Sequence, residues 1–204
     1  KNIVYNEQGI ISSITYPAGT LTVSFNRDII GNVISTTDPL GNLTTIEYNH
    51  AGNAKKLTDA EGRITEFSYD SMNKLISVID AAGGITNYGY DLEGNLITLT
   101  DPRGEQTLFE YNEMNQLISK TNPLGLTETF SYDANGNLIS KTSPNGELIE
   151  FSYDEANQLT KKRLPDNVII SLAYDESGNA TSIVNPYSNI TRTFDLRNRL
   201  VSVS

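Results

Sequence analysis

Tyrosine recurs at a fixed interval of 21 residues along most of the chain. The series comprises Tyr48, Tyr69, Tyr90, Tyr111, Tyr132, Tyr153 and Tyr174, and Tyr5, Phe25 and Phe194 continue it toward the two ends at slightly different spacings. Similarity to itself at a fixed period of about 20–50 residues is the signature of repeat proteins. The spacing therefore predicts that residues 1–204 form a single array of about nine repeats. Since neither end carries a visible capping unit, we expect the array to be truncated at both ends.

A turn signal follows each of these tyrosines. The next residue is usually an acidic one, as in Asp70, Asp91, Asp133, Asp154 and Asp175. Four positions after the aromatic residue stand Gly52, Asn73, Gly94, Asn115, Gly136, Asn157, Gly178 and Asn198. Glycine adopts a positive φ without steric cost, and asparagine is the next most tolerant residue. The pattern predicts a type I turn followed by a left-handed residue, which is a common connection in β-hairpins.

At this left-handed position glycine and asparagine alternate strictly from Gly52 to Asn198, so the full period is 42 residues. The sequence is compatible with two explanations. A unit of two hairpins was duplicated recently, or neighbouring turns lie in different surroundings.

A second turn signal follows about ten residues after the first, as in Asp101-Pro102-Arg103-Gly104. Between the turns the residues alternate: Phe130 and Tyr132 lie on one face of a strand and Ser131 on the other. This alternation predicts half-buried strands whose aromatic face is covered. The leucines expected on that face are Leu75, Leu96, Leu117, Leu138 and Leu159. Turns this frequent leave no room for helices of ordinary length.

The predicted fold is all-β, with tandem 21-residue hairpins forming a long antiparallel meander. Nine hairpins would give about eighteen strands, whereas twisted open sheets rarely exceed about 10 strands without curling. We therefore expect the meander to coil into a spiral or shell. Unpaired outer strands are templates for pairing, so edge-to-edge self-association is also expected.

Charge and composition exclude several classes of function. The chain has 15 lysines and arginines against 25 acidic residues, a net charge of −10, which argues against binding to a nucleic-acid backbone. No apolar run is long enough to predict a membrane span. Without cysteine, the chain has neither disulfides nor thiolate chemistry.

The segment Tyr132-Asp133-Ala134-Asn135-Gly136-Asn137-Leu138-Ile139 resembles the YD repeat, also called the RHS repeat. The resemblance extends over essentially the whole chain. It implies a large β-sheet spiral that can close into a hollow shell. In bacterial members, which include Rhs polymorphic toxins, insecticidal toxin-complex components and wall-associated proteins, the shell encloses or presents a C-terminal toxic domain. In the similar teneurins the shell serves cell adhesion.

Three features of the sequence bear on a binding or catalytic site. His50 is the only histidine, and it is expected to be an exposed strand-end residue that replaces the turn aspartate or a neighbour of it. The pattern Asp133-x-Asn135-x-Asn137 is similar to the start of a calcium loop, but the twelfth position is Pro144, where that loop has glutamate. The tyrosine rows could stack on sugar rings, although their alternation with small polar residues favours a structural role. No catalytic residue, metal site or cofactor is predicted.

Two classes of function follow, and both are non-enzymatic. The first is a scaffold segment of a shell around a toxic C-terminal domain in a secreted bacterial protein. Its partners would be the remaining repeats and that domain. The second is an adhesion or carbohydrate-binding module at the cell surface, with a glycan as partner. The family resemblance implies a secreted or surface location in either case.

Overall fold

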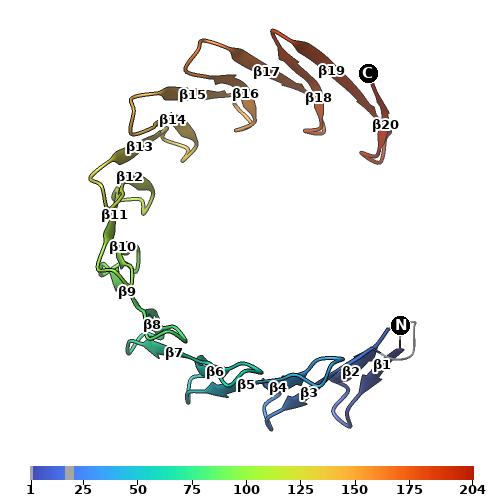
Figure 1. Ribbon diagram of the computed structural model, residues 1–204. Coiled ribbons are helices and arrows are strands. Elements are labelled where there is room, and N and C mark those ends of the chain that lie inside the picture. Colours follow the sequence, from blue (N-terminus) through green and yellow to red (C-terminus); the bar gives the residue numbers. More distant parts are fainter. Residues whose placement is uncertain (1, 17–20) are drawn as a thin grey trace. The chain divides into compact units, whose positions relative to one another are not determined.

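The computed structural model describes residues 2–16 and 21–204, and every regular element in these residues is a β-strand. The chain divides into two compact units. The first unit comprises residues 1–90 and 98–105, and the second comprises residues 91–97 and 106–204. The strands are coloured in chain order in Figure 1.

The strands that lie in the first unit are β1 (Asn2–Tyr5), β2 (Ile11–Thr15), β3 (Thr22–Arg27), β4 (Val33–Thr37), β5 (Leu43–Tyr48), β6 (Ala54–Thr58), β7 (Ile64–Tyr69), β8 (Leu75–Ile79) and β9 (Ile85–Tyr90). β10 (Leu96–Thr100) has residues in both units. The second unit contains β11 (Gln106–Tyr111), β12 (Leu117–Thr121), β13 (Thr127–Tyr132), β14 (Leu138–Thr142), β15 (Leu148–Tyr153), β16 (Leu159–Arg163), β17 (Ile169–Tyr174), β18 (Ala180–Asn185), β19 (Ser188–Phe194) and β20 (Leu200–Val203).

These bounds confirm the all-β prediction and the 21-residue period. We call the seven tyrosines spaced 21 residues apart, from Tyr48 to Tyr174, the anchor tyrosines. From β5 to β17, every second strand ends at one of them, and its partner strand begins six residues later. The described residues contain twenty strands rather than about eighteen, and Tyr5 and Phe194 end β1 and β19 as the anchor tyrosines end their strands. The assignment of Phe25 to this series was wrong, because β3 ends two residues later at Arg27, which lies opposite Val33 in the position of an anchor tyrosine.

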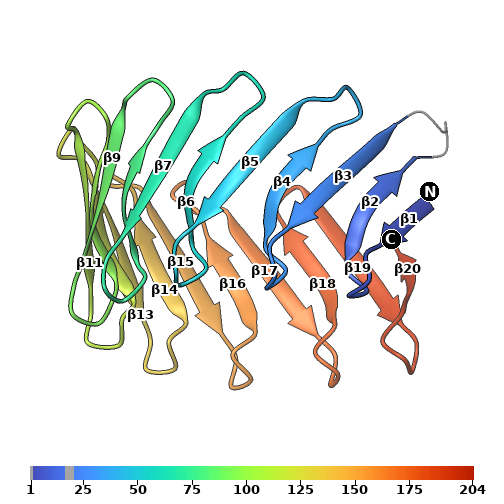
Figure 2. The same ribbon diagram turned by 90° about the horizontal axis from the view of Figure 1, so that it is seen from below.

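Within each unit the sheet is a simple meander, in which consecutive strands pair antiparallel. The pairing runs from β1 to β9 in the first unit and from β11 to β20 in the second. The turns of each unit therefore lie along two opposite edges of its sheet (Figure 2). We call the turn after each anchor aromatic residue a tyrosine turn, and the turn at the other edge a return turn.

The two kinds of strand pair differ in length. Across a tyrosine turn, β13 and β14 pair at four positions, with a bulge between Ser131 and Tyr132. Across a return turn, β14 and β15 pair at only three positions, and the pairing ends at Ser140 and Glu150. Beyond that point toward the tyrosine turns, β14 and β15 have no paired residues. Consecutive hairpins therefore need side chains to hold them together at this edge.

The aromatic face is where the sequence predicted it, but it is not buried. Tyr132 lies opposite Leu138, and Leu75, Leu117 and Leu159 lie opposite anchor tyrosines in the same way, so these leucines share the aromatic face. Among the described residues, however, no hydrophobic side chain is buried, and Ser35 is the only buried residue. The expectation of a covered face was wrong. Each unit is a single layer of sheet, so that neither face has a second layer against which to pack.

Candidate functional site

The seven anchor tyrosines form one repeated arrangement. Each is half-buried, and each donates its hydroxyl to a main-chain carbonyl in the preceding hairpin, 15 residues earlier. Tyr132 Oη, for example, is 2.9 Å from the carbonyl oxygen of Leu117, the first residue of β12. The carbonyl accepts this bond at the splayed end of the strand pair, where the ladder has stopped. The hydroxyl thus takes the place of a missing ladder bond between hairpins.

The acidic turn residue is a second repeated arrangement. In the turn after Tyr132, Asp133 Oδ1 accepts hydrogen bonds from the main-chain nitrogens of Asn135 (2.9 Å) and Asn137 (2.8 Å), while Oδ2 accepts one from Asn137 Nδ2 (3.0 Å). The main chain closes the turn, since Gly136 N donates to Asp133 O at 3.1 Å. Asp70, Asp154 and Asp175 accept from the same two main-chain positions of their own turns, and Asp91 accepts from Gly94 N and Asn95 N.

These bonds explain the calcium-like pattern of the sequence. Both carboxylate oxygens of Asp133 already accept N–H groups of the turn, so the spacing of Asp and Asn serves the hairpin. Within residues 2–16 and 21–204, no group of three or more acidic, histidine or cysteine side chains is arranged to hold a metal ion. His50 is exposed at the tip of the turn that begins at Asn49.

The left-handed positions are those predicted. Gly52, Gly94, Gly136 and Gly178 have φ values of 84°, 99°, 88° and 83°, and the asparagines between them have φ values near +60°. The predicted conformation is confirmed at all eight positions. The role of these glycines, aspartates and tyrosines as the residues that hold the array together stays a prediction.

Lysine side chains cover part of the aromatic face. Lys141 lies directly across the strand pair from Phe130, and its Nζ is 5.5 Å from the ring centroid. Lys162 is placed in the same way over Phe151, at 5.7 Å, and Lys74 lies over Tyr90 at 5.3 Å. Cations at this distance are attracted to the ring face. The lysine stems also cover apolar surface that a single-layer sheet leaves open. Lys141 and Lys162 stand 21 residues apart, in step with the tyrosines, and this spacing is the sequence signal that could have predicted two of these contacts.

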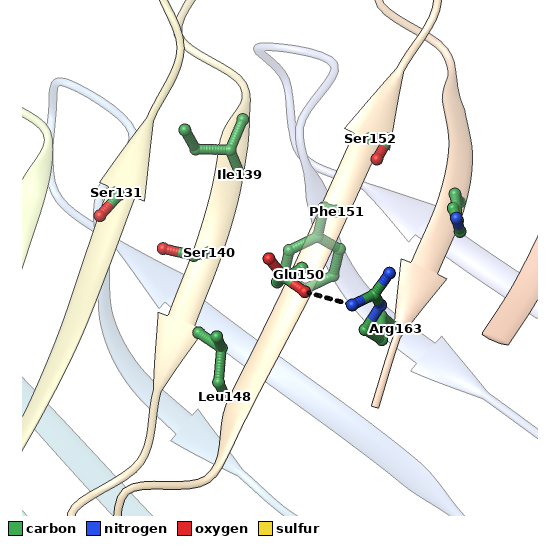
Figure 3. Close-up of a pocket in the computed structure, with 9 residues that line it drawn as sticks. Ser131, Ile139, Ser140, Leu148, Glu150, Phe151, Ser152 and Arg163 are labelled. Atoms are coloured by element: carbon green, nitrogen blue, oxygen red, sulfur yellow. Dashed lines mark ion pairs between the residues drawn. The ribbon is translucent and has the colours of Figure 1, made fainter. Parts of the chain in front are cut away.

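The opposite, small-residue face of the second unit carries a groove of about 500 Å³ between β13 and β16. Its lining includes Ser131, Ser140, Glu150 and Arg163 (Figure 3). Glu150 and Arg163 form an ion pair of 3.5 Å, with both side chains 46% exposed. An exposed pair of this kind contributes little to stability. The serines of the groove have no histidine beside them to act as a base.

Acid should weaken the tyrosine turns. Hydrogen bonds from the side chains of Asn95, Asn137 and Asn179 hold the pKa values of Asp91, Asp133 and Asp175 below their ordinary value of 3.8, and main-chain N–H donors add to this. A folded-state pKa below the unfolded one gives stability that is complete above the unfolded pKa and is lost as the pH falls through the folded pKa. We therefore expect the melting temperature to change little between pH 7 and pH 5, and to fall below about pH 4.

The control for this prediction is the Asp133→Asn, Asp175→Asn double variant, whose amide oxygens still accept hydrogen bonds but do not titrate. It should lose less of its melting temperature than the parent between pH 5 and pH 2. An equal loss in both proteins would contradict the assignment of acid sensitivity to these turns.

A family model of the RHS repeat matches residues 48–85, 90–129 and 132–169, which together are more than half of the chain. The chain belongs to the RHS-repeat family. Its repeats are the hairpins described above, and the three matches contain β6 to β8, β10 to β12 and β14 to β16 in full. No curated protein sequence matches the chain. The described residues contain no helix that is long and apolar enough to cross a membrane.

Solved structures of toxin complexes contain a similar fold. A crystal structure of TcdB2–TccC3 without its hypervariable C-terminal region has a TM-score of 0.60 at 19% sequence identity, and the match covers 96% of this chain and 13% of that one. A crystal structure of TcdB2–TccC3 gives a TM-score of 0.60 at 18% identity, covering 96% and 14%. The Photorhabdus luminescens Tc holotoxin pore gives 0.56 at 18%, covering 96% and 13%. At these identities the similarity shows the fold alone. The RHS array spans about one seventh of the length of these chains.

Proposed function

We propose that this RHS array is a non-enzymatic wall segment of a shell that encloses or presents a toxic C-terminal domain in a secreted bacterial protein. The observation that supports this most is the uninterrupted meander of hairpins, whose fold matches segments of the TcdB2–TccC3 structures over 96% of the chain. One of those structures is described as lacking a hypervariable C-terminal region.

The construction of the array suits a wall. Each hairpin is held to the next by a tyrosine hydroxyl and by a short strand ladder, so that the sheet is extended by adding identical units. In neither unit is the aromatic face buried in a hydrophobic core. We propose that the meander coils, as a long twisted sheet must, and that residues 1–204 form one array within it. The partners of the segment would then be the further repeats and the C-terminal domain of the parent protein.

The test is protease protection in the full-length parent protein. If the repeats form a closed wall, the segment that follows the array should resist a protease that digests the same segment expressed alone. A matched variant would carry Tyr111→Ala, Tyr132→Ala and Tyr153→Ala, which remove three inter-hairpin hydroxyl bonds. This variant should admit the protease. Equal digestion of the C-terminal segment in the parent, in the variant and in isolation would contradict the proposal.

A carbohydrate-binding role is the alternative, and the half-exposed aromatic face gives it a specific basis. Sugar stacking needs free ring faces, but Lys74, Lys141 and Lys162 lie over the rings of Tyr90, Phe130 and Phe151. The wall proposal is therefore the better supported of the two. Millimolar binding of a glycan at the other rings, detected by chemical-shift changes, would favour the alternative.

Association through strand edges is also a proposal. All side chains of β1 and β20 are exposed, and they include Ile3, Val4, Leu200 and Val201. Exposed apolar strands of this kind pair readily with other strands, whether those of further repeats or of a second copy.

A further inference from the structure

The alternation of glycine and asparagine in the tyrosine turns coincides with a second alternation, in the residue that follows. In the second unit, turns with a left-handed glycine continue with asparagine, as in Gly94-Asn95, Gly136-Asn137 and Gly178-Asn179. The turns between them have a left-handed asparagine followed by glutamine, in Asn115-Gln116 and Asn157-Gln158. Two kinds of turn thus alternate along one edge of the sheet.

The asparagine side chain of the first kind of turn donates a hydrogen bond to the left-handed asparagine of the second kind. Asn95 Nδ2 lies 2.8 Å from Oδ1 of Asn115, the left-handed residue of the next turn. The bond recurs every 42 residues, between Asn137 and Asn157 at 2.8 Å and between Asn179 and Asn198 at 3.1 Å. In the first unit the corresponding pair is Asn53 and Asn73, at 3.2 Å. The left-handed asparagine therefore supplies an acceptor as well as a tolerated backbone conformation.

The second kind of turn places its glutamine amide against the glycine of the next turn. Gln116 Nε2 lies 3.4 Å from the main-chain oxygen of Gly136. A Cβ at position 136 would lie 3.2 Å from this nitrogen, and a Cβ at Gly178 would lie 3.0 Å from Nε2 of Gln158. Both distances are tighter than ordinary van der Waals contact, so the glutamine amide would have to move away. Here glycine leaves room for the glutamine amide in addition to adopting the backbone conformation.

Gly52 provides a comparison within the same chain. The preceding turn ends in Gly31-Asn32, and Asn32 donates its side-chain amide to Asp28 Oδ2 of its own turn at 3.0 Å. A Cβ at position 52 would meet nothing within 4 Å. Gly52, which follows an asparagine turn, is therefore sterically free, whereas Gly136 and Gly178, which follow glutamine turns, are not.

We infer that, from Gly94 to Asn198, these side chains form an amide ladder along the tyrosine-turn edge, in which each turn favours the left-handed residue of the next. In this part of the chain, asparagine after glycine donates to a left-handed asparagine, and glutamine after asparagine lies against a left-handed glycine. The structural period of this part of the RHS array is thus two hairpins, or 42 residues, and the ladder favours the side-by-side fit of unlike turns. This inference explains the alternation by the different surroundings of neighbouring turns. It is independent of the proposed function.

The test places asparagine at two left-handed glycines with different predecessors. Gly136→Asn sets a side chain against Gln116, whereas Gly52→Asn enters open space and offers Asn32 a new acceptor. Both changes put the same residue at a similar φ, 88° and 84°. We expect Gly136→Asn to melt about 2–4 °C below Gly52→Asn. Equal melting temperatures would overturn the ladder.

The Gln116→Ala, Gly136→Asn double variant separates the ladder from backbone strain. Without the glutamine amide, the asparagine at position 136 should be accommodated. Gly136→Asn should therefore lower the melting temperature much less in the Gln116→Ala background than in the parent protein. An unchanged deficit would overturn the inference, because it would show that the cost arises within the turn.

The donor side is tested by a double-mutant cycle of Asn137→Ala and Asn157→Gly. If Asn137 acts through Asn157 Oδ1, the shift caused by Asn137→Ala should be smaller in the Asn157→Gly background. The same cycle between Asn137 and Asn115, which share no hydrogen bond, should be additive. Additivity in both cycles would contradict the ladder.

Discussion

Tyr132→Ala should destabilise the C-terminal half of the array by about 2–3 kcal/mol. Full burial would make an aromatic-to-alanine change cost about 3–5 kcal/mol, but this ring is half-buried and the cost is reduced accordingly. The lost hydrogen bond to the carbonyl oxygen of Leu117 contributes about 1 kcal/mol of the total. The effect should be concentrated where hairpins meet, so hydrogen exchange of the β12 and β13 amides is the sharpest measurement, with denaturant unfolding alongside it.

Two further variants divide this loss into its parts. Tyr132→Phe keeps the ring and removes only the hydroxyl, so it should cost about 1 kcal/mol. Tyr187→Ala removes a tyrosine that is 85% exposed, in the turn between β18 and β19, and should cost less than about 0.5 kcal/mol. If Tyr132→Ala unfolds at the same denaturant concentration as Tyr187→Ala, the anchor tyrosines do not hold the hairpins together.

Gly136→Val should destabilise the protein by about 2–3 kcal/mol. The residue has a φ of +88°, and a β-branched side chain is strongly disfavoured in that region. The new Cβ would also press against Gln116 Nε2 at 3.2 Å. Relief of the strain would require the turn to open and its main-chain bond to Asp133 to break. Melting followed by circular dichroism should show the loss, at about 2–4 °C for each kcal/mol.

Ala134→Val is the matched control, because position 134 is an exposed residue in the same turn and is not among the residues with positive φ. The same side chain two positions away should leave the melting temperature nearly unchanged. A comparable loss from both substitutions would mean that the turn rejects bulk in general, and that backbone conformation is not the cause.

The sequence by itself determined the hairpins. A turn of this kind is closed by bonds between residues at most four positions apart, and Asp133, Gly136 and Asn137 carry that geometry in their own side-chain chemistry. The 21-residue interval then placed the strands, and the alternation of Phe130, Ser131 and Tyr132 gave each strand its two faces. These features are local, so they can be predicted from the residues of one repeat, and the same pattern recurs in the other repeats.

Only the tertiary structure decided what lies between hairpins. The hydroxyl of each anchor tyrosine reaches a carbonyl 15 residues back, the asparagine amides reach acceptors about 20 residues on, and lysine ammonium groups lie over the rings. These contacts depend on where the ladder between β14 and β15 stops and on the bulge beside each tyrosine. The alternating pattern predicted a buried aromatic face, but burial needs a second layer, and neither unit supplies one. A strand pattern determines which face a side chain occupies, whereas the packing of whole elements determines whether that face is covered.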